Sequence, residues 1–173
     1  WFPSLARRSY VIDNYPPWCA KVQAQPPVRC LLEQGRVSFT CATANHSDGS
    51  PVQLGDLGIP APEDHEVVWS AYMRALDDVS SRGVLLDAAL VDGRFRISSA
   101  LKLLHVIHSE SVVFIHDFWP RVRPSHRYGG LLGYYDVIGR ARSAVALRRK
   151  PPQELPSSWK HAFEEQWVRT IYA

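Results

Sequence analysis

The sequence predicts an α/β fold built on a doubly wound, mostly parallel sheet. Segments typical of strands and of helices alternate along its 173 residues, and such alternation favours parallel strands joined by crossover helices. Residues 88–91 and 111–115 are nearly continuous apolar runs. Strands covered on both faces have this pattern, and we expect 88–91 to be a central strand. Ligands bind at the carboxyl ends of the strands in open sheets of this kind, so we expect the functional site at that edge.

The first third of the chain predicts a strand, one helix, a second strand and a loop. Residues 9–13 form a β-branched and aromatic run that is typical of a buried strand. A proline pair at 16–17 suits the first turn of a helix, and a second pair at 26–27 is expected to end it. Residues 36–43 are the next strand, and the polar stretch 45–58 indicates a long loop.

The middle of the chain predicts two helices, each followed by one of the apolar strands. The first helix opens at 60–64, where acidic residues suit its first turn, and Gly83 is its expected C-cap. Apolar side chains recur along it at spacings of three and four, at Val68, Trp69, Tyr72, Met73, Leu76 and Val79. The second helix is expected over residues 96–107.

The C-terminal part predicts a short helix, a last strand and an appended helix. Residues 128–138 form a helix weakened by three glycines, and 144–150 form a strand that gives the domain a hairpin-like end. The tail 157–171 is expected to be helical, with aromatic side chains spaced four apart at Trp159, Phe163 and Trp167. We therefore divide the chain into an α/β domain, 1–151, and a proline-rich linker with a C-terminal helix, 152–173.

Composition limits the classes of function. The formal charge is only +3, whereas nucleic-acid binding favours a concentrated basic face, so no nucleic-acid partner is expected. No apolar run approaches the ~18–20 residues that span a bilayer. The first eight residues lack an initiator Met and become charged too early for a secretory signal. We therefore expect a processed or trimmed chain.

The three cysteines predict free thiols. Cys19, Cys30 and Cys41 are odd in number and far apart in the sequence, so neither a disulfide framework nor a zinc knuckle is expected. Buried free thiols are the favoured interpretation, and they agree with a reducing, intracellular compartment.

Ionisable residues end three of the predicted strands. Asp13 ends the first strand, Asp92 follows 88–91, and His116 and Asp117 follow the strand before them. These residue types serve as general acids and bases, and carboxylates also bind divalent cations. Each has a structural alternative, because Asp92 could cap the next helix, Asp13 could belong to a turn and His116 could be a structural histidine.

Two segments resemble class I S-adenosylmethionine-dependent methyltransferases. Residues 86–96, which contain VDGRFR, and residues 111–118, which contain IHDF, are similar to the fourth and fifth strands of that family. Residues 9–13 resemble its second strand and 144–151 its last strand, so the resemblance covers about residues 1–151. It implies a Rossmann-like fold with S-adenosylmethionine as cofactor, whose ribose hydroxyls would be bound by Asp13.

The resemblance leaves out the first strand and the glycine-rich turn of the family. Only residues 1–8 precede the strand that resembles the second one. Three explanations are open: a truncated chain, a missing part supplied elsewhere, or a degenerate cofactor site.

Metal-dependent relatives in this family, the catechol and macrocin O-methyltransferases, suggest a divalent cation. By resemblance Asp92 matches their first metal ligand, and His116 and Asp117 match the adjacent pair. A histidine in place of a carboxylate favours a softer metal than Mg²⁺, or a general base that works without metal.

Two classes of function follow from the sequence. The first is an enzyme that transfers a methyl group to the hydroxyl of a small, sugar-like molecule, with Asp92, His116 and Asp117 as catalytic residues. The second is a catalytically inactive, methyltransferase-like subunit of a larger complex, which would dock on a protein partner through the aromatic C-terminal helix. The same aromatic side chains could instead pack on their own domain.

Overall fold

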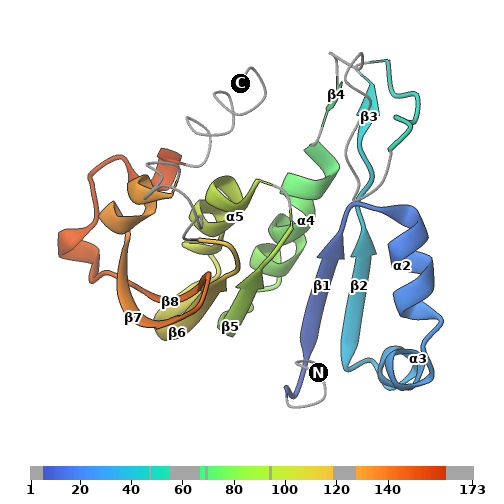
Figure 1. Ribbon diagram of the computed structural model, residues 1–173, viewed down its shortest axis with the longest axis horizontal. Coiled ribbons are helices and arrows are strands. Elements are labelled where there is room, and N and C mark those ends of the chain that lie inside the picture. Colours follow the sequence, from blue (N-terminus) through green and yellow to red (C-terminus); the bar gives the residue numbers. More distant parts are fainter. Residues whose placement is uncertain are drawn as a thin grey trace. The chain divides into compact units, whose positions relative to one another are not determined.

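The chain folds into two compact α/β units, Trp1–Ala75 and Leu76–Ala173. The computed structural model, shown in Figure 1, describes residues 6–46, 48–54, 67–68, 70–93, 95–118 and 128–162. Helices separate β1 from β2 and β5 from β6, and the predicted α/β class is confirmed. The division at residues 151 and 152 stays a prediction.

The first unit is built on two parallel strands joined by two helices. Strand β1 (Ser9–Asp13) pairs with β2 (Val37–Cys41) along its whole length. Helices α2 (Pro16–Gln23) and α3 (Pro26–Glu33) connect them, and each begins at a proline pair. The sequence predicted a single helix here, because the second proline pair was interpreted only as a stop. Proline lacks an N–H that the first helical turn does not need, so the same pair also begins α3.

A second correction concerns residues 45–79. The predicted loop contains β3 (Asn45–His46), which pairs antiparallel with β4 (Val67–Val68). Val68 therefore belongs to a strand, and helix α4 runs only from Ser70 to Ser81. Valine favours strands, and pairing with β3 overrides the helical periodicity of the sequence. The predicted helix start at 60–64 lies outside the described residues.

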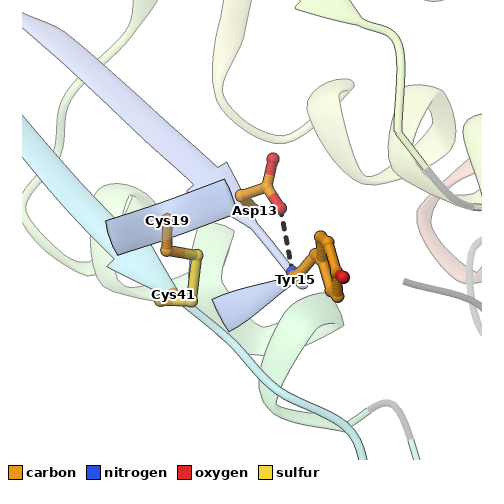
Figure 2. Close-up of a disulfide and its surroundings, with 4 residues drawn as sticks. All are labelled: Asp13, Tyr15, Cys19 and Cys41. Atoms are coloured by element: carbon orange, nitrogen blue, oxygen red, sulfur yellow. Dashed lines mark hydrogen bonds between the residues drawn. A yellow bond between two sulfur atoms is a disulfide. The ribbon is translucent and has the colours of Figure 1, made fainter. Parts of the chain in front are cut away.

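The cysteine prediction was wrong. Cys19 of α2 and Cys41 at the end of β2 form a disulfide with Sγ atoms 2.04 Å apart and Cα atoms 6.1 Å apart (Figure 2). The two residues lie 22 positions apart in the sequence, and the disulfide joins α2 to the end of β2, the strand that pairs with β1. Cys30 is a free thiol but is exposed rather than buried.

The second unit contains a mixed four-stranded sheet in the order β5-β6-β8-β7. Strands β5 (Leu86–Val91) and β6 (Ile107–Ile115) are parallel and are joined by helix α5 (Arg96–Leu103). The hairpin of β7 (Tyr135–Ala141) and β8 (Ala144–Arg149) adds to β6 in the antiparallel sense. The predicted hairpin-like end is therefore confirmed.

Strand β5 differs from its prediction as a central strand. It lies at one edge of the four-stranded sheet, and the side chain of Leu90 is 59% exposed. An apolar run indicates a strand but does not by itself determine its place in the sheet.

The C-terminal elements differ more from their predictions than β5 does. Residues 128–138 form a 3₁₀ helix, Gly129–Gly133, followed by the start of β7, because glycine disfavours an α-helix. Of the predicted C-terminal helix, the structure describes a short 3₁₀ helix, Trp159–His161. Trp159 stacks on His105 with ring centroids 5.3 Å apart, so this member of the aromatic series packs on its own unit. Phe163 and Trp167 lie outside the described residues.

Tyr135 anchors the core of the second unit. It is 1% exposed, and its hydroxyl donates a 2.6 Å hydrogen bond to the carbonyl of Ala100 in α5. Burial raises the pKa of Tyr135 far above its ordinary value, against a smaller opposite effect of Arg149. The phenol therefore stays neutral and joins β7 to the end of α5.

No helix in the described ranges is both long enough and apolar enough to cross a bilayer.

We expect Y135F to lower the free energy of unfolding by about 1–3 kcal/mol, because it leaves the buried Ala100 carbonyl without its donor. Urea denaturation of the full chain measures this. The neighbouring, half-buried Tyr134 provides the control, and Y134F should change stability by less than about 0.5 kcal/mol. Equal effects of the two substitutions would contradict the role of the hydrogen bond.

We expect the double variant C19S/C41S to lose about 3 kcal/mol of stability, since the disulfide closes a loop of intermediate length. Denaturation with and without reductant gives the comparison, and C30S is the matched control with unchanged stability. Thiol titration of the unfolded, unreduced chain should find only the thiol of Cys30. Three reactive thiols would show that the pair is reduced.

Candidate active site

The carboxyl ends of β5 and β6 meet at one edge of the sheet. The two strands are parallel, and Val91 pairs with Ile115 at their ends. The backbone N–H of His116 donates to the carbonyl of Val91 at 3.1 Å. Asp92 and His116 therefore leave neighbouring strands side by side.

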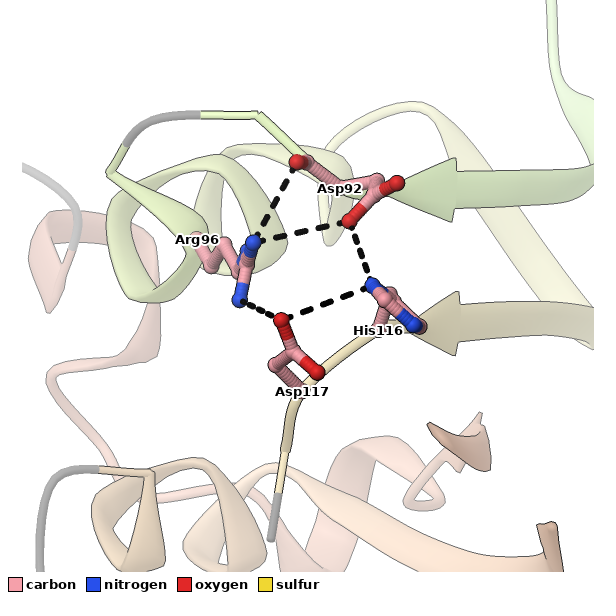
Figure 3. A network of polar contacts seen from close by, with 4 residues as sticks. All are labelled: Asp92, Arg96, His116 and Asp117. Atoms are coloured by element: carbon pink, nitrogen blue, oxygen red, sulfur yellow. Dashed lines mark hydrogen bonds and ion pairs between the residues drawn. The ribbon is translucent and has the colours of Figure 1, made fainter. Parts of the chain in front are cut away.

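A polar network forms at this edge, and Figure 3 shows its four residues. Nδ1 of His116 lies 2.8 Å from Oδ1 of Asp92 and 3.6 Å from Oδ2 of Asp117. These three predicted site residues thus come together, and each is about half exposed.

Arg96 completes the network and was not predicted. Its Nη2 lies 3.4 Å from Oδ1 of Asp92, and its Nη1 lies 3.7 Å from Oδ2 of Asp117. Nη2 also donates to the backbone carbonyl of Asp92 at 3.3 Å. The Arg96 side chain is only 20% exposed, and its guanidinium bridges both carboxylates. The spacing of four residues between Asp92 and Arg96 is a known signal for an ion pair and could have indicated this contact.

The backbone is unusual at two points beside the network. Phe95 and Asp117 have positive φ angles of 51° and 52°, in a region that is unfavourable for residues other than glycine by roughly 1–2 kcal/mol each. Aspartate tolerates this region better than phenylalanine does. Such conformations cluster at functional sites, where the surrounding structure holds them in place.

The alternative role of Asp92 as a helix cap is not observed. The N-cap of α5 is Phe95, and no side chain there makes a capping hydrogen bond. The carboxylate of Asp92 faces His116 and Arg96 instead. His116 is 48% exposed and so differs from a histidine buried for structural reasons.

The network does not fit the predicted metal site. Across the described ranges, no group of three or more His, Cys, Asp or Glu residues could hold a metal ion. Oδ1 of Asp92 and Oδ2 of Asp117 both face the guanidinium of Arg96. One oxygen of each carboxylate therefore already has a cationic partner, which weakens the attraction of the pair for a further cation.

Asp13 lies in the first unit, at the end of β1. Its Oδ1 accepts the backbone N–H of Tyr15 at 2.9 Å, as Figure 2 shows. This contact is an Asx turn, which matches the structural alternative for Asp13. Its role in binding ribose hydroxyls stays a prediction.

A pocket of about 200 Å³ lies elsewhere in the second unit, and none of the predicted site residues lines it. Within it, Lys102 and Asp77 form an ion pair of 2.6 Å, so the two charges neutralise each other. Its lining residues are Leu76, Asp77, Ser80, Lys102, His105 and Val106.

Comparisons with known proteins support the fold. No protein family matches the sequence, and no curated protein is similar to it. A solved structure, a methyltransferase-like protein from Silicibacter pomeroyi, is similar with a TM-score of 0.55 and 21% sequence identity. The match covers 98% of this chain and 81% of that one. The chain therefore has a methyltransferase-like, Rossmann-like α/β fold.

Proposed function

We propose that the protein is an S-adenosylmethionine-dependent O-methyltransferase in which His116 accepts the proton of a small, sugar-like hydroxyl compound. The observation that carries this proposal is the pairing of His116 with Asp92 at the carboxyl ends of β5 and β6. Ligands bind at this edge in open α/β sheets, and the methyltransferase-like fold adds support for the type of reaction.

The hydrogen bond to Asp92 determines which ring nitrogen of His116 can act as a base. An ionised carboxylate only accepts hydrogen bonds, so the proton of the neutral ring lies on Nδ1 and points at Oδ1 of Asp92. Nε2 then keeps its lone pair, and no described residue bonds to it. The ring is therefore oriented with its basic nitrogen available, as general-base catalysis requires.

The negative charge of Asp92 has a second effect. When His116 takes up a proton, the imidazolium lies 2.8 Å from this carboxylate and 3.6 Å from that of Asp117. Both carboxylates stabilise the charge that develops on the ring during the reaction.

The reaction needs few groups beyond this base. When bound, S-adenosylmethionine would supply an electrophilic methyl group on a positively charged sulfur. The acceptor oxygen would take this methyl group, with the carbon–sulfur electrons left on sulfur. The hydroxyl proton moves to Nε2 of His116. Correct positioning supplies much of the rate of such a transfer.

We expect H116A to lower turnover by roughly 10²–10⁴-fold, the usual contribution of a general base, while the affinity for S-adenosylhomocysteine is unchanged. D92A should give a smaller loss, because the ring is then no longer oriented. The measurement is transfer of a labelled methyl group to a panel of small hydroxyl compounds, with calorimetry for the affinity.

His108 provides the matched control for this experiment. It pairs with Asp87 at 3.1 Å, at the opposite ends of the same two strands. H108A should leave turnover unchanged. Loss of activity in H108A equal to that in H116A would point to a general structural defect. Full activity of H116A would reject His116 as the base, and absence of both transfer and cofactor binding would favour an inactive structural subunit.

We also expect D13A to weaken binding of S-adenosylhomocysteine by about tenfold, through loss of a charged hydrogen bond to a ribose hydroxyl. D13N keeps an oxygen that can accept the N–H of Tyr15. It therefore distinguishes the effect of losing the turn from the effect of losing the ligand contact. Stability restored in D13N with affinity still reduced would support ribose binding. Unchanged affinity in both variants would leave Asp13 as a turn residue only.

A further inference from the structure

Two carboxylates and one guanidinium define the charge of the strand-end network. Asp92 and Asp117 leave neighbouring strands, and Arg96 contacts one with Nη2 and the other with Nη1. Guanidinium does not lose its proton in proteins. The network therefore contains a permanent positive charge between two negative ones.

The position of Arg96 has no explanation in the stability of its own helix. It is the first residue of α5, where the helix dipole disfavours a positive charge. The side chain is nevertheless mostly buried at 20% exposure, and its buried Nε has no hydrogen-bond partner among the described residues. The contacts that compensate for this placement are those with Asp92 and Asp117.

The same oxygens contact both Arg96 and His116. Oδ1 of Asp92 faces Nη2 of Arg96 and Nδ1 of His116, and Oδ2 of Asp117 faces Nη1 of Arg96 and the same Nδ1 (Figure 3). Arg96 thus holds each carboxylate in the position that directs one oxygen at Nδ1.

The geometry points to Arg96 as the cation of this site. Its guanidinium has the electrostatic role that a divalent metal ion has between paired carboxylates. As a positioning residue it fixes Asp92 and Asp117 beside Nδ1 of His116. It also engages one oxygen of each carboxylate and repels a divalent cation through its own charge. The site is therefore independent of metal.

Metal titration tests this inference without cofactor or acceptor, so its failure and the failure of the proposed function are distinguishable. We expect no saturable Mn²⁺ binding by the wild-type chain in electron paramagnetic resonance at millimolar metal. R96M removes the charge but keeps an unbranched chain, and it should gain a Mn²⁺ site that binds at least about tenfold more tightly than the wild-type chain does. R96K keeps a cation and should resemble the wild type.

Two controls define the gained site. D92N in the R96M background should abolish it, because Asp92 would be a ligand. K102M removes the basic partner of a different carboxylate, Asp77, and should gain nothing. A merely structural Arg96 would give destabilised variants with no change in metal binding. Folded R96M with no Mn²⁺ site would therefore overturn the inference, as would Mn²⁺ binding by the wild type that D92N abolishes.

Nuclear magnetic resonance of the wild-type chain gives a second measurement that does not depend on how R96M folds. Long-range ¹H–¹⁵N spectra should show His116 with its proton on Nδ1, and millimolar Mg²⁺ should leave its signals in place. Selective movement of the His116 signals with Mg²⁺ would overturn the inference.

Discussion

Parallel pairing of β5 with β6 determines where the polar chemistry of the second unit lies. The register places Val91 opposite Ile115, so the next residues of both strands leave the sheet at the same edge. A shift by one residue would turn their side chains to opposite faces and separate Asp92 from His116. Residues 24 positions apart in the sequence become hydrogen-bond partners because two apolar strands pair in one register. The network depends on the core beneath it.

The network combines several local features that are each unfavourable alone. Phe95 and Asp117 have left-handed backbone conformations, and Arg96 places a positive charge at the amino end of α5. Two carboxylates at neighbouring strand ends would repel each other without that charge. Together these features offset one another's unfavourable free energies, because the guanidinium joins the two carboxylates and the turns orient them. Compensated strain of this kind is frequent where residues are held for a function rather than for stability.

The sequence predicted those features that depend on local pattern. Strands β1, β5 and β6 and the convergence of Asp92, His116 and Asp117 follow from apolar runs and from the rule for parallel sheets. The disulfide of Cys19 with Cys41, the contact of Arg96 with Asp117 and the pairing of β3 with β4 are tertiary contacts between distant segments. Spacing in the sequence carries little information about them. Helix α3 was missed for a different reason, since a proline pair can both end one helix and begin the next.

The two histidine–aspartate pairs of this sheet show why residue type alone does not identify a base. His108 and Asp87 lie 3.1 Å apart at one end of β5 and β6, much as His116 and Asp92 do at the other. In His108, however, Nδ1 accepts the backbone N–H of Glu110 at 3.2 Å while Nε2 faces Asp87. Both of its nitrogens are engaged, and no lone pair is left for a substrate. In His116 only Nδ1 is engaged by the described residues, so the same pair of residue types leaves a basic nitrogen free at the edge where α/β sheets bind their ligands.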